Sequence, residues 1–336
     1  MNDLYNFILP KELIAQEPAS PRDSARLLVY ECSTGKIVDS VFRVLGKHLK
    51  TSTTIALNNS KVEHCRWLFD GGIEIFVLQK LDTNTITAMV RKGKKFQPGK
   101  DVQLTDWLTV STVAIDENGL RTLRLSVPHD DRRLQKYEHV PMPPYIEQND
   151  KLADEYQTVY AKPLGSKAAP TAGLHFTEEL LTELSKSFPI EEITLHVGLG
   201  TFAPLTDKHL STGKLHQEYF EINDRSLAAI YAAKHITAVG TTTVRTLETI
   251  FGRSGQKTHG YTDILIRAGY DFRRVDAMIT NFHLPSTSLL MLVAAFIADK
   301  KGLSEKQAAA ELMRIYAHAI AKKYRFYSFG DAMLIV

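Results

Sequence analysis

The segment Ile236-Thr237-Ala238-Val239-Gly240-Thr241-Thr242-Thr243-Val244-Arg245-Thr246-Leu247-Glu248-Thr249-Ile250-Phe251 decides the fold class of this chain. Ile236–Val239 is short, apolar and rich in β-branched residues, which is typical of a buried strand. From Val244 to Phe251 the apolar residues share one helical face, while Arg245 and Glu248 share another, so the apolar face is expected to pack on a sheet. A strand that leads through a glycine directly into such a helix indicates α/β architecture.

Strands and helices alternate on both sides of this segment. Strand patterns occupy Ile193–Val197 and Ala277–Thr280, and helical patterns occupy Thr177–Ser187 and Arg225–Lys234. Ser304-Glu305-Lys306-Gln307 is a capping-box sequence, which predicts the start of a final helix. Ala25–Glu31 and Thr54–Asn58 also have strand character, and periodicity does not decide which sheet they join.

The stretch from about Gly71 to Val127 has a different pattern, with strands and no helices between them. Three runs are rich in β-branched and aromatic residues, namely Ile73–Val77, Thr85–Val90 and Trp107–Val113. Asp116-Glu117-Asn118-Gly119 is a turn sequence that predicts a hairpin. Successive short strands of this kind predict a small antiparallel β-barrel, whose end is marked by the rigid connector Pro141–Tyr145.

Composition narrows the classes of function. Lys and Arg total 41 and Asp and Glu total 38, so the formal net charge of +3 is too small for a dedicated nucleic-acid binder. Cys32 and Cys65 are too few for a disulfide framework and lack zinc-ligand spacing. The longest apolar run, Leu289–Ala298, is about half the length of a membrane span. The first residues lack a secretory pattern, so we expect a cytoplasmic protein.

Two basic runs are candidates for RNA contact. Arg91–Lys100 contains no acidic residue, and Lys322–Tyr327, which includes Arg325, interleaves cations with aromatic side chains. The alternatives are a solvated turn for the first run and a packed C-terminal segment for the second. Taken singly, each run favours its alternative, because short charged runs are common on protein surfaces.

Two loops after the connector carry polar residues and glycines. In Ala169–Phe176, Thr171 and His175 could bind a ligand or transfer protons, with Gly173 between them; the alternative is a helix cap and a packed imidazole. His196-Val197-Gly198-Leu199-Gly200-Thr201-Phe202 follows a strand, but it lacks a third glycine, and Pro204 discourages the helix that a dinucleotide site requires. Gly198 and Gly200 remain candidates for close approach of the backbone to a ligand.

Two further segments lie at expected strand ends. Thr241, Thr242, Thr243 and Arg245 place hydroxyls, backbone amides and a cation at a helix N-terminus, which suits a carboxylate or a phosphate. An ordinary threonine N-cap is the alternative. Asn281 and His283 follow a strand and precede an apolar helix, and a structural hydrogen-bond network is the competing account.

A metal site and a hydrolase site are both poorly supported. Four histidines fall near these loops, namely His175, His196, His216 and His283. None of them has a spacing typical of metal ligands, so we expect no metal. No Gly-x-Ser-x-Gly sequence is present for a serine nucleophile.

Several long motifs together resemble the S-adenosylmethionine:tRNA ribosyltransferase-isomerase family of queuosine biosynthesis. They are Met142–Ile146, Tyr156–Ala161, Ala168–Phe176, Thr194–Phe202, His216–Tyr219, Ala238–Glu248, Thr280–Pro285 and Tyr324–Met333. The resemblance covers the chain from about Met142 to its end and is weak in the barrel. It implies a discontinuous α/β domain of residues 1–60 and 145–336, with residues 61–144 as an inserted β-barrel domain.

The resemblance also implies a reaction and its partners. The family transfers and isomerises the ribosyl part of S-adenosylmethionine onto 7-aminomethyl-7-deazaguanine at the wobble position of tRNA, which gives epoxyqueuosine, adenine and methionine. S-adenosylmethionine is then a co-substrate, no permanent cofactor or membrane partner is expected, and the protein is expected to be a monomer. A divergent paralogue acting on another nucleoside or RNA, and a non-catalytic RNA-binding protein, are the alternatives.

This chemistry requires a base for the carbon next to the sulfonium, an acid for the departing adenine, and a neutral attacking amine. His175 and His283 are the candidates for base and acid, and Asp331 or Glu218 for stabilising the cations. Thr241–Arg245 would take the methionine carboxylate or an RNA phosphate. The other expected substrate contacts are Thr171, Gly173, His196, Gly198, Gly200, Asn281 and Arg325.

Overall fold

The computed structural model describes residues 2–146, 149–198, 200, 205–252 and 257–336. The chain forms two compact units. One consists of the residues up to Val62 together with Pro143–Val336, and the other is Glu63–Met142. The mixed α/β class predicted from the sequence is confirmed. In the described part of the chain, no helix is both long and apolar enough to cross a bilayer.

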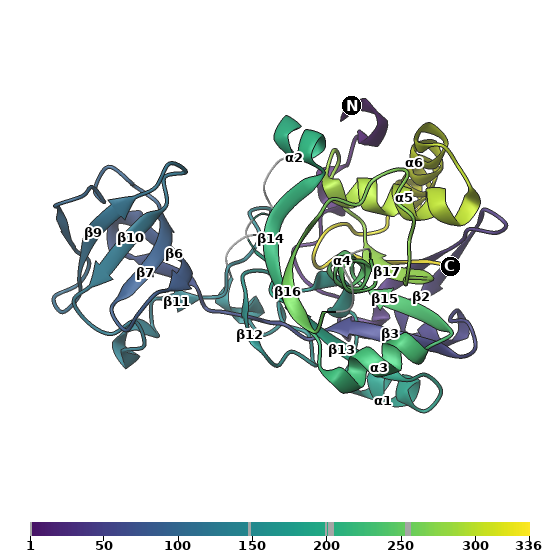
Figure 1. The fold of residues 1–336 in the computed structure, drawn as a ribbon, viewed down its shortest axis with the longest axis horizontal. Helices are drawn as coiled ribbons and strands as arrows, with labels where there is room; N and C mark the ends of the chain where they lie inside the picture. Colours follow the sequence, from purple (N-terminus) through teal and green to yellow (C-terminus); the bar gives the residue numbers. More distant parts are fainter. Residues whose placement is uncertain (1, 147–148, 199, 201–204, 253–256) are drawn as a thin grey trace. The chain divides into compact units, whose positions relative to one another are not determined.

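The larger unit is built on a nine-stranded mixed sheet (Figure 1). In spatial order its strands are β16 (His259–Ile264), β14 (Lys214–Glu221), β13 (Ile190–Leu195), β3 (Thr53–Asn58), β15 (His235–Val239), β17 (Ala277–Asn281), β18 (Ala332–Ile335), β1 (Arg26–Glu31) and β2 (Lys36–Val41). The four strands β13, β3, β15 and β17 are parallel, and both β14 and β18 run antiparallel to them. β1 and β3, the two N-terminal strands whose sheet the sequence pattern left undecided, therefore both belong to this sheet. A separate parallel pair joins β4 (Lys61–Val62) to β12 (Leu164–Ser166).

The two faces of the large sheet carry separate apolar cores, because successive strand residues point to opposite sides. Leu28, Ala56 and Met278 belong to one core, and their neighbours Leu27 and Ile55 belong to the other. The first core is covered by α3 (Asp224–Ala232), α4 (Thr241–Ile250), α5 (Ser288–Lys301) and α6 (Glu305–Ala321). The second is covered by α1 (Glu178–Ser185), while α2 (Asp207–Thr212) precedes β14. The capping box predicted at the start of α6 is confirmed.

The smaller unit is a curled antiparallel sheet of seven strands that forms a half-barrel. Its strands in spatial order are β11 (Glu138–His139), β5 (Arg66–Phe69), β6 (Ile73–Lys80), β7 (Thr85–Val90), β10 (Arg121–Leu125), β9 (Thr109–Ile115) and β8 (Asp101–Gln103). Side chains including Trp67, Ile75, Val110 and Leu123 fill its own core. Alternation of buried and partly buried residues along β5 and β6 explains the pattern seen in the sequence.

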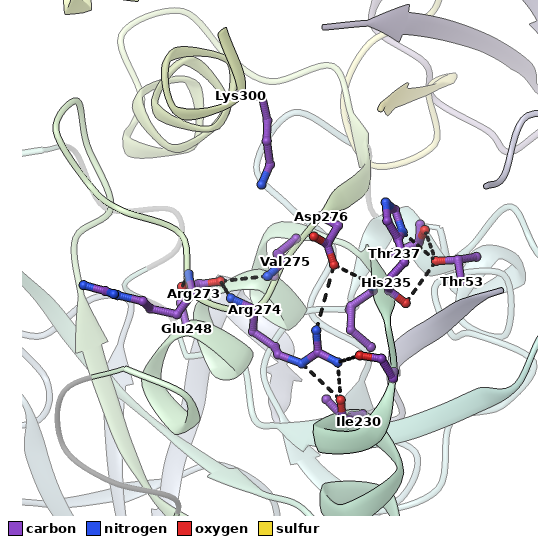
Figure 2. Close-up of polar contacts among 12 residues, drawn as sticks. Thr53, Ile230, His235, Thr237, Glu248, Arg273, Arg274, Val275, Asp276 and Lys300 are labelled. Carbon is purple, nitrogen blue, oxygen red and sulfur yellow. Dashed lines mark hydrogen bonds and ion pairs between the residues drawn. The ribbon is translucent and has the colours of Figure 1, made fainter. Parts of the chain in front are cut away.

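Helix α4 is buried around most of its circumference, including its charged residues. The side chain of Glu248 accepts hydrogen bonds from the backbone amides of Arg273, Arg274 and Val275 at 2.8–3.0 Å, and one from the Tyr270 hydroxyl at 3.3 Å. Figure 2 shows this carboxylate at the backbone of Val275, while the guanidinium of Arg274 donates to backbone carbonyls at the end of α3. The loop before β17 is therefore fixed by a buried carboxylate that an amphipathic pattern assigns to the polar face.

We expect Glu248→Gln to destabilise the protein by about 1–3 kcal/mol, because an amide nitrogen would face backbone N–H donors that now have an acceptor. Urea denaturation would measure this as a lower midpoint at an unchanged slope. Tyr270→Phe, which removes only the longest of these hydrogen bonds, is the matched control and should cost less. A Glu248→Gln protein with the midpoint of the wild type would contradict this role.

Candidate active site

A cavity of about 460 Å³ lies where the parallel strands β15 and β17 end. This is the edge at which open α/β sheets bind ligands, and the volume is within the range of small-molecule sites, roughly 300–1,000 Å³. Polar side chains from several loops and strand ends line it, namely Thr171, Thr241, Thr242, Thr280, Asn281, His283, Ser286, Thr287, Ser288 and Ser328. Three tyrosines, Tyr145, Tyr156 and Tyr327, also line it, together with apolar side chains such as Val197 and Phe282.

Asn281 connects the cavity wall to a buried histidine. Its side-chain oxygen accepts from the Thr171 hydroxyl at 2.8 Å, and its amide nitrogen lies 3.2 Å from Nε2 of His175. Because that nitrogen donates, Nε2 must accept, and the His175 proton must be on Nδ1. His175 is only 4% exposed and packs its ring against Phe42. His175 therefore lies behind the cavity wall and reaches the cavity through Asn281.

The electrostatic environment keeps both candidate histidines neutral at pH 7. Burial, with smaller contributions from the charges of Arg325 and Arg22, lowers the pKa of His175 to about 3. Burial lowers the pKa of His283 to about 4. His283 itself lines the cavity, with Nε2 at 2.8 Å from the Thr280 hydroxyl. A neutral imidazole in this position can accept a proton from a bound ligand.

Helix α4 begins at the cavity with an uncapped first turn. Gly240 occupies the N-cap position with φ of +89°, a conformation that favours glycine, and no side chain caps the helix. The predicted alternative of an ordinary threonine N-cap is therefore wrong. Thr243 instead donates its hydroxyl back to the Val239 carbonyl at 2.6 Å, while Thr241 and Thr242 line the cavity. The helix thus directs its first amides toward the ligand side.

A second, smaller cavity of about 40 Å³ shares Thr241 and Thr242 with the first and is also lined by Gly200. Glu218 of β14 and Arg245 of α4 lie on its wall and form an ion pair through Oε2 and Nη1. Glu218 also accepts from the amide of Gly198 at 3.0 Å. A two-residue alternation in β14 buries Glu218 and Phe220, so one strand face carries both the carboxylate and core side chains.

Seven of the expected site residues line neither cavity, namely Gly173, His175, His196, Gly198, Thr243, Asp331 and Arg325. Gly173 packs against Tyr160, and His196 contacts the Ser60 hydroxyl through Nδ1 at 2.8 Å. The carboxylate of Asp331 accepts the backbone amides of Arg26 and Arg325 at 3.0 and 2.8 Å, so it holds the turn before β18. The Arg325 side chain donates to the Glu17 carbonyl. Leu199, Thr201, Phe202 and Pro204 of the glycine motif lie outside the described residues.

The tyrosines are the main feature that motif analysis did not assign to the site. The rings of Tyr145 and Tyr327 lie 4.5 Å apart, and the Tyr145 hydroxyl is 2.8 Å from that of Ser328. In the sequence, Tyr145 is the last residue of the proline-rich connector, and Tyr327 is the last residue of the basic aromatic run. Tyr324 and Phe326 of that run are fully buried, so the packed alternative holds for them. Within the described residues, no cluster of three His, Cys, Asp or Glu side chains could hold a metal ion.

Comparison with known proteins identifies similar chains along the full length. A family model described as "Queuosine biosynthesis protein" matches residues 2–335. Proteins named S-adenosylmethionine:tRNA ribosyltransferase-isomerase from Symbiobacterium thermophilum and a Sulfurihydrogenibium species are 40% and 42% identical, over 99% of this chain and 98% of theirs. The crystal structure of the Thermotoga maritima S-adenosylmethionine tRNA ribosyltransferase is similar with a TM-score of 0.56 at 32% identity, covering 99% of this chain and 100% of that one.

The low pKa of His175 predicts a pH-dependent contribution to stability. The pKa of His175 is about 6.5 in the unfolded state and about 3 in the folded state. Between these pH values the unfolded state therefore binds one more proton than the folded state. The unfolding free energy should therefore fall as pH drops from about 6.5 toward 3. His175→Gln should be less stable at pH 7 by about 0.5–3 kcal/mol but should show a shallower fall. Denaturation at several pH values, with the exposed His259→Gln as control, would measure this, and parallel curves for wild type and His175→Gln would refute it.

Proposed function

The chain belongs to the queuosine biosynthesis protein family, and from this membership we propose that it is an S-adenosylmethionine:tRNA ribosyltransferase-isomerase that works in the cavity at the ends of β15 and β17. It transfers and isomerises the ribosyl moiety of S-adenosylmethionine onto 7-aminomethyl-7-deazaguanine at the wobble position of tRNA, with adenine and methionine as the other products. The match over 99% of the chain at about 40% identity carries this conclusion, and favours it over a divergent paralogue or a non-catalytic RNA-binding protein.

The cavity suits a nucleoside that carries a positive charge. The rings of Tyr145 and Tyr327 offer aromatic surface on which adenine can stack. Aromatic faces also attract cations, so the same rings suit the sulfonium of S-adenosylmethionine. Hydroxyl groups from Thr171, Thr241 and Ser328 supply hydrogen-bond partners for a ribose or a base edge.

Among the groups that line the cavity, His283 is the candidate base. The sulfonium acidifies the neighbouring 5′ carbon, and a neutral imidazole beside it can remove the proton. His175 lines neither cavity and reaches the larger one only through Asn281, so we assign it to positioning Asn281 and Thr171 instead of to proton transfer. Asp331 has a similar positioning role, because it fixes the turn that carries Tyr327.

The partners follow from this assignment. S-adenosylmethionine acts as a co-substrate, no permanent cofactor or metal is required, and the second substrate is a tRNA with the modified wobble base. Thr241, Thr242, Arg245 and Glu218 bind the charged parts of the substrates at the start of α4, whereas the hydroxyl of Thr243 is already bonded to the Val239 carbonyl. Gly198 and Gly200 allow the backbone near that site to approach closely, and Arg325 and His196 lie outside the two cavities. We expect a monomer that acts in the cytoplasm.

Incubation of the protein with S-adenosylmethionine and tRNA bearing the aminomethyl-deazaguanine base should release adenine and methionine in equal amounts. Neither product should form with unmodified tRNA, because the attacking amine is then absent. Chromatography of the small molecules would measure both products. Dialysis against a chelator is the control for a metal, and an activity that it abolishes and zinc restores would require a metal-dependent mechanism.

His283→Asn should lower kcat by roughly 10²–10⁴-fold with little change in melting temperature, because it removes a proton-transfer group. In the wild type, kcat/KM should fall as pH drops toward about 4, where His283 becomes protonated. His175→Gln is the matched comparison and should lose stability but keep more turnover than His283→Asn. Near-normal turnover by His283→Asn would exclude it as the base.

A further inference from the structure

We propose that the smaller cavity is the subsite for the amino-acid end of S-adenosylmethionine, in which Nη2 of Arg245 binds the substrate carboxylate. This inference rests on the proposed function and adds to it a specific contact. It makes Arg245 a residue that distinguishes an α-amino acid from an amine lacking the carboxylate.

The guanidinium of Arg245 has one donor group left over in a buried position. Nη1 pairs with Glu218, and Nε donates to the carbonyl of Ile264 at 3.2 Å. Arg245 is only 7% exposed, and its Nη2 is buried without a hydrogen-bond partner among the described residues. Buried charged donors are normally satisfied, so the missing partner is an acceptor that arrives with a ligand. A carboxylate is the acceptor that best matches a guanidinium.

The position of Arg245 fits the tail of a ligand whose nucleoside lies in the larger cavity. The two cavities share Leu205, Thr241, Thr242, Ser288 and Leu289, so they adjoin along the start of α4. The smaller cavity has about 40 Å³, whereas one water needs about 10–15 Å³, so a small polar group fits. The uncapped first turn of α4 adds backbone amides to the same border.

Charge and size favour an amino acid over an RNA phosphate. Arg245 and Glu218 neutralise each other, and both are buried. A zwitterion brings a carboxylate to the cation and an ammonium to the neighbourhood of the anion, so the buried site stays neutral. A phosphodiester would leave a net negative charge in a buried site, which is costly. It would also need room for a nucleotide on each side, which a cavity of this volume does not provide.

The test compares S-adenosylmethionine with its decarboxylated analogue on the full-length wild-type protein. Turnover is followed as adenine release from each compound with the modified tRNA, and calorimetric titration measures binding of each compound without turnover. We expect the KM and Kd of the analogue to be higher on the order of 10–100-fold, since a hydrogen bond to a charged group is lost. Because the ligand is changed and the protein is not, this arm is independent of whether variants fold.

The protein-side arm uses Arg245→Lys and Arg245→Gln, with the exposed Arg273→Gln as matched control. Both Arg245 variants should bind S-adenosylmethionine more weakly, and removal of the carboxylate should then cost little more, because the two changes delete the same contact. Arg273→Gln should behave as the wild type toward both compounds.

Equal KM and Kd of wild type for the two compounds would overturn the inference. So would Arg245→Gln variants that lose tRNA affinity while their Kd for S-adenosylmethionine is unchanged, because Arg245 would then serve an RNA phosphate. An absence of adenine release by the wild type from S-adenosylmethionine would instead reject the proposed function. The titrations would in that case still decide whether Arg245 recognises the carboxylate.

Discussion

The parallel pairing of β3 with two later strands is the constraint on which the rest of the larger unit depends. β3 lies between β13 and β15 and is hydrogen-bonded to both. Asn58, its last residue, exchanges hydrogen bonds of 3.0 Å with the backbone of Leu195 and also accepts the amide of Ser60. These contacts fix where β13 ends. The chain leaves the sheet just after that point. Val197 then lines the larger cavity, and the amide of Gly198 donates to Glu218.

The site combines apolar surroundings with a few polar groups whose charge states the fold controls. His175 and His283 are held neutral by burial, and the buried ion pair of Glu218 and Arg245 is neutral as a whole. The cavity therefore presents little net charge of its own to a cationic sulfonium. Under the proposed function, hydrogen-bond geometry orients the substrate instead of attraction between net charges, and this suits a reaction in which several protons change position.

Local patterns in the sequence were sufficient to predict most strands and helices. They also predicted the change near Pro141 from successive strands to alternating strands and helices. Ile236–Val239 and the helix after it could be predicted because periodicity and a glycine turn agree. The C-terminal strand at Ala332–Ile335 was missed, since four apolar residues have no periodicity of their own and their pairing is set by distant strands. Thr171, Asn281 and His283, which line the larger cavity, could be proposed as site residues from polar residues at strand ends and helix starts. Sequence spacing does not encode the tertiary contacts that place His283, and not His175, at the cavity. The same holds for Asp331, whose carboxylate binds backbone amides.

The place of β18 in the sheet has a consequence for the order of assembly during synthesis. β18 fills the position between β17 and β1, so Leu27 acquires its neighbour Ala332 only after some 300 further residues have been made. Until then β1 and β2 form a hairpin with an unpaired edge, while the smaller unit already has all its strands. Residues 63–142 thus contain every strand of their own sheet before β18 is made, whereas the larger sheet still lacks a strand in its interior. In a nascent chain that lacks β18, the edge of β1 has no partner in this sheet, and an unpaired apolar strand edge is the type of surface that chaperones protect.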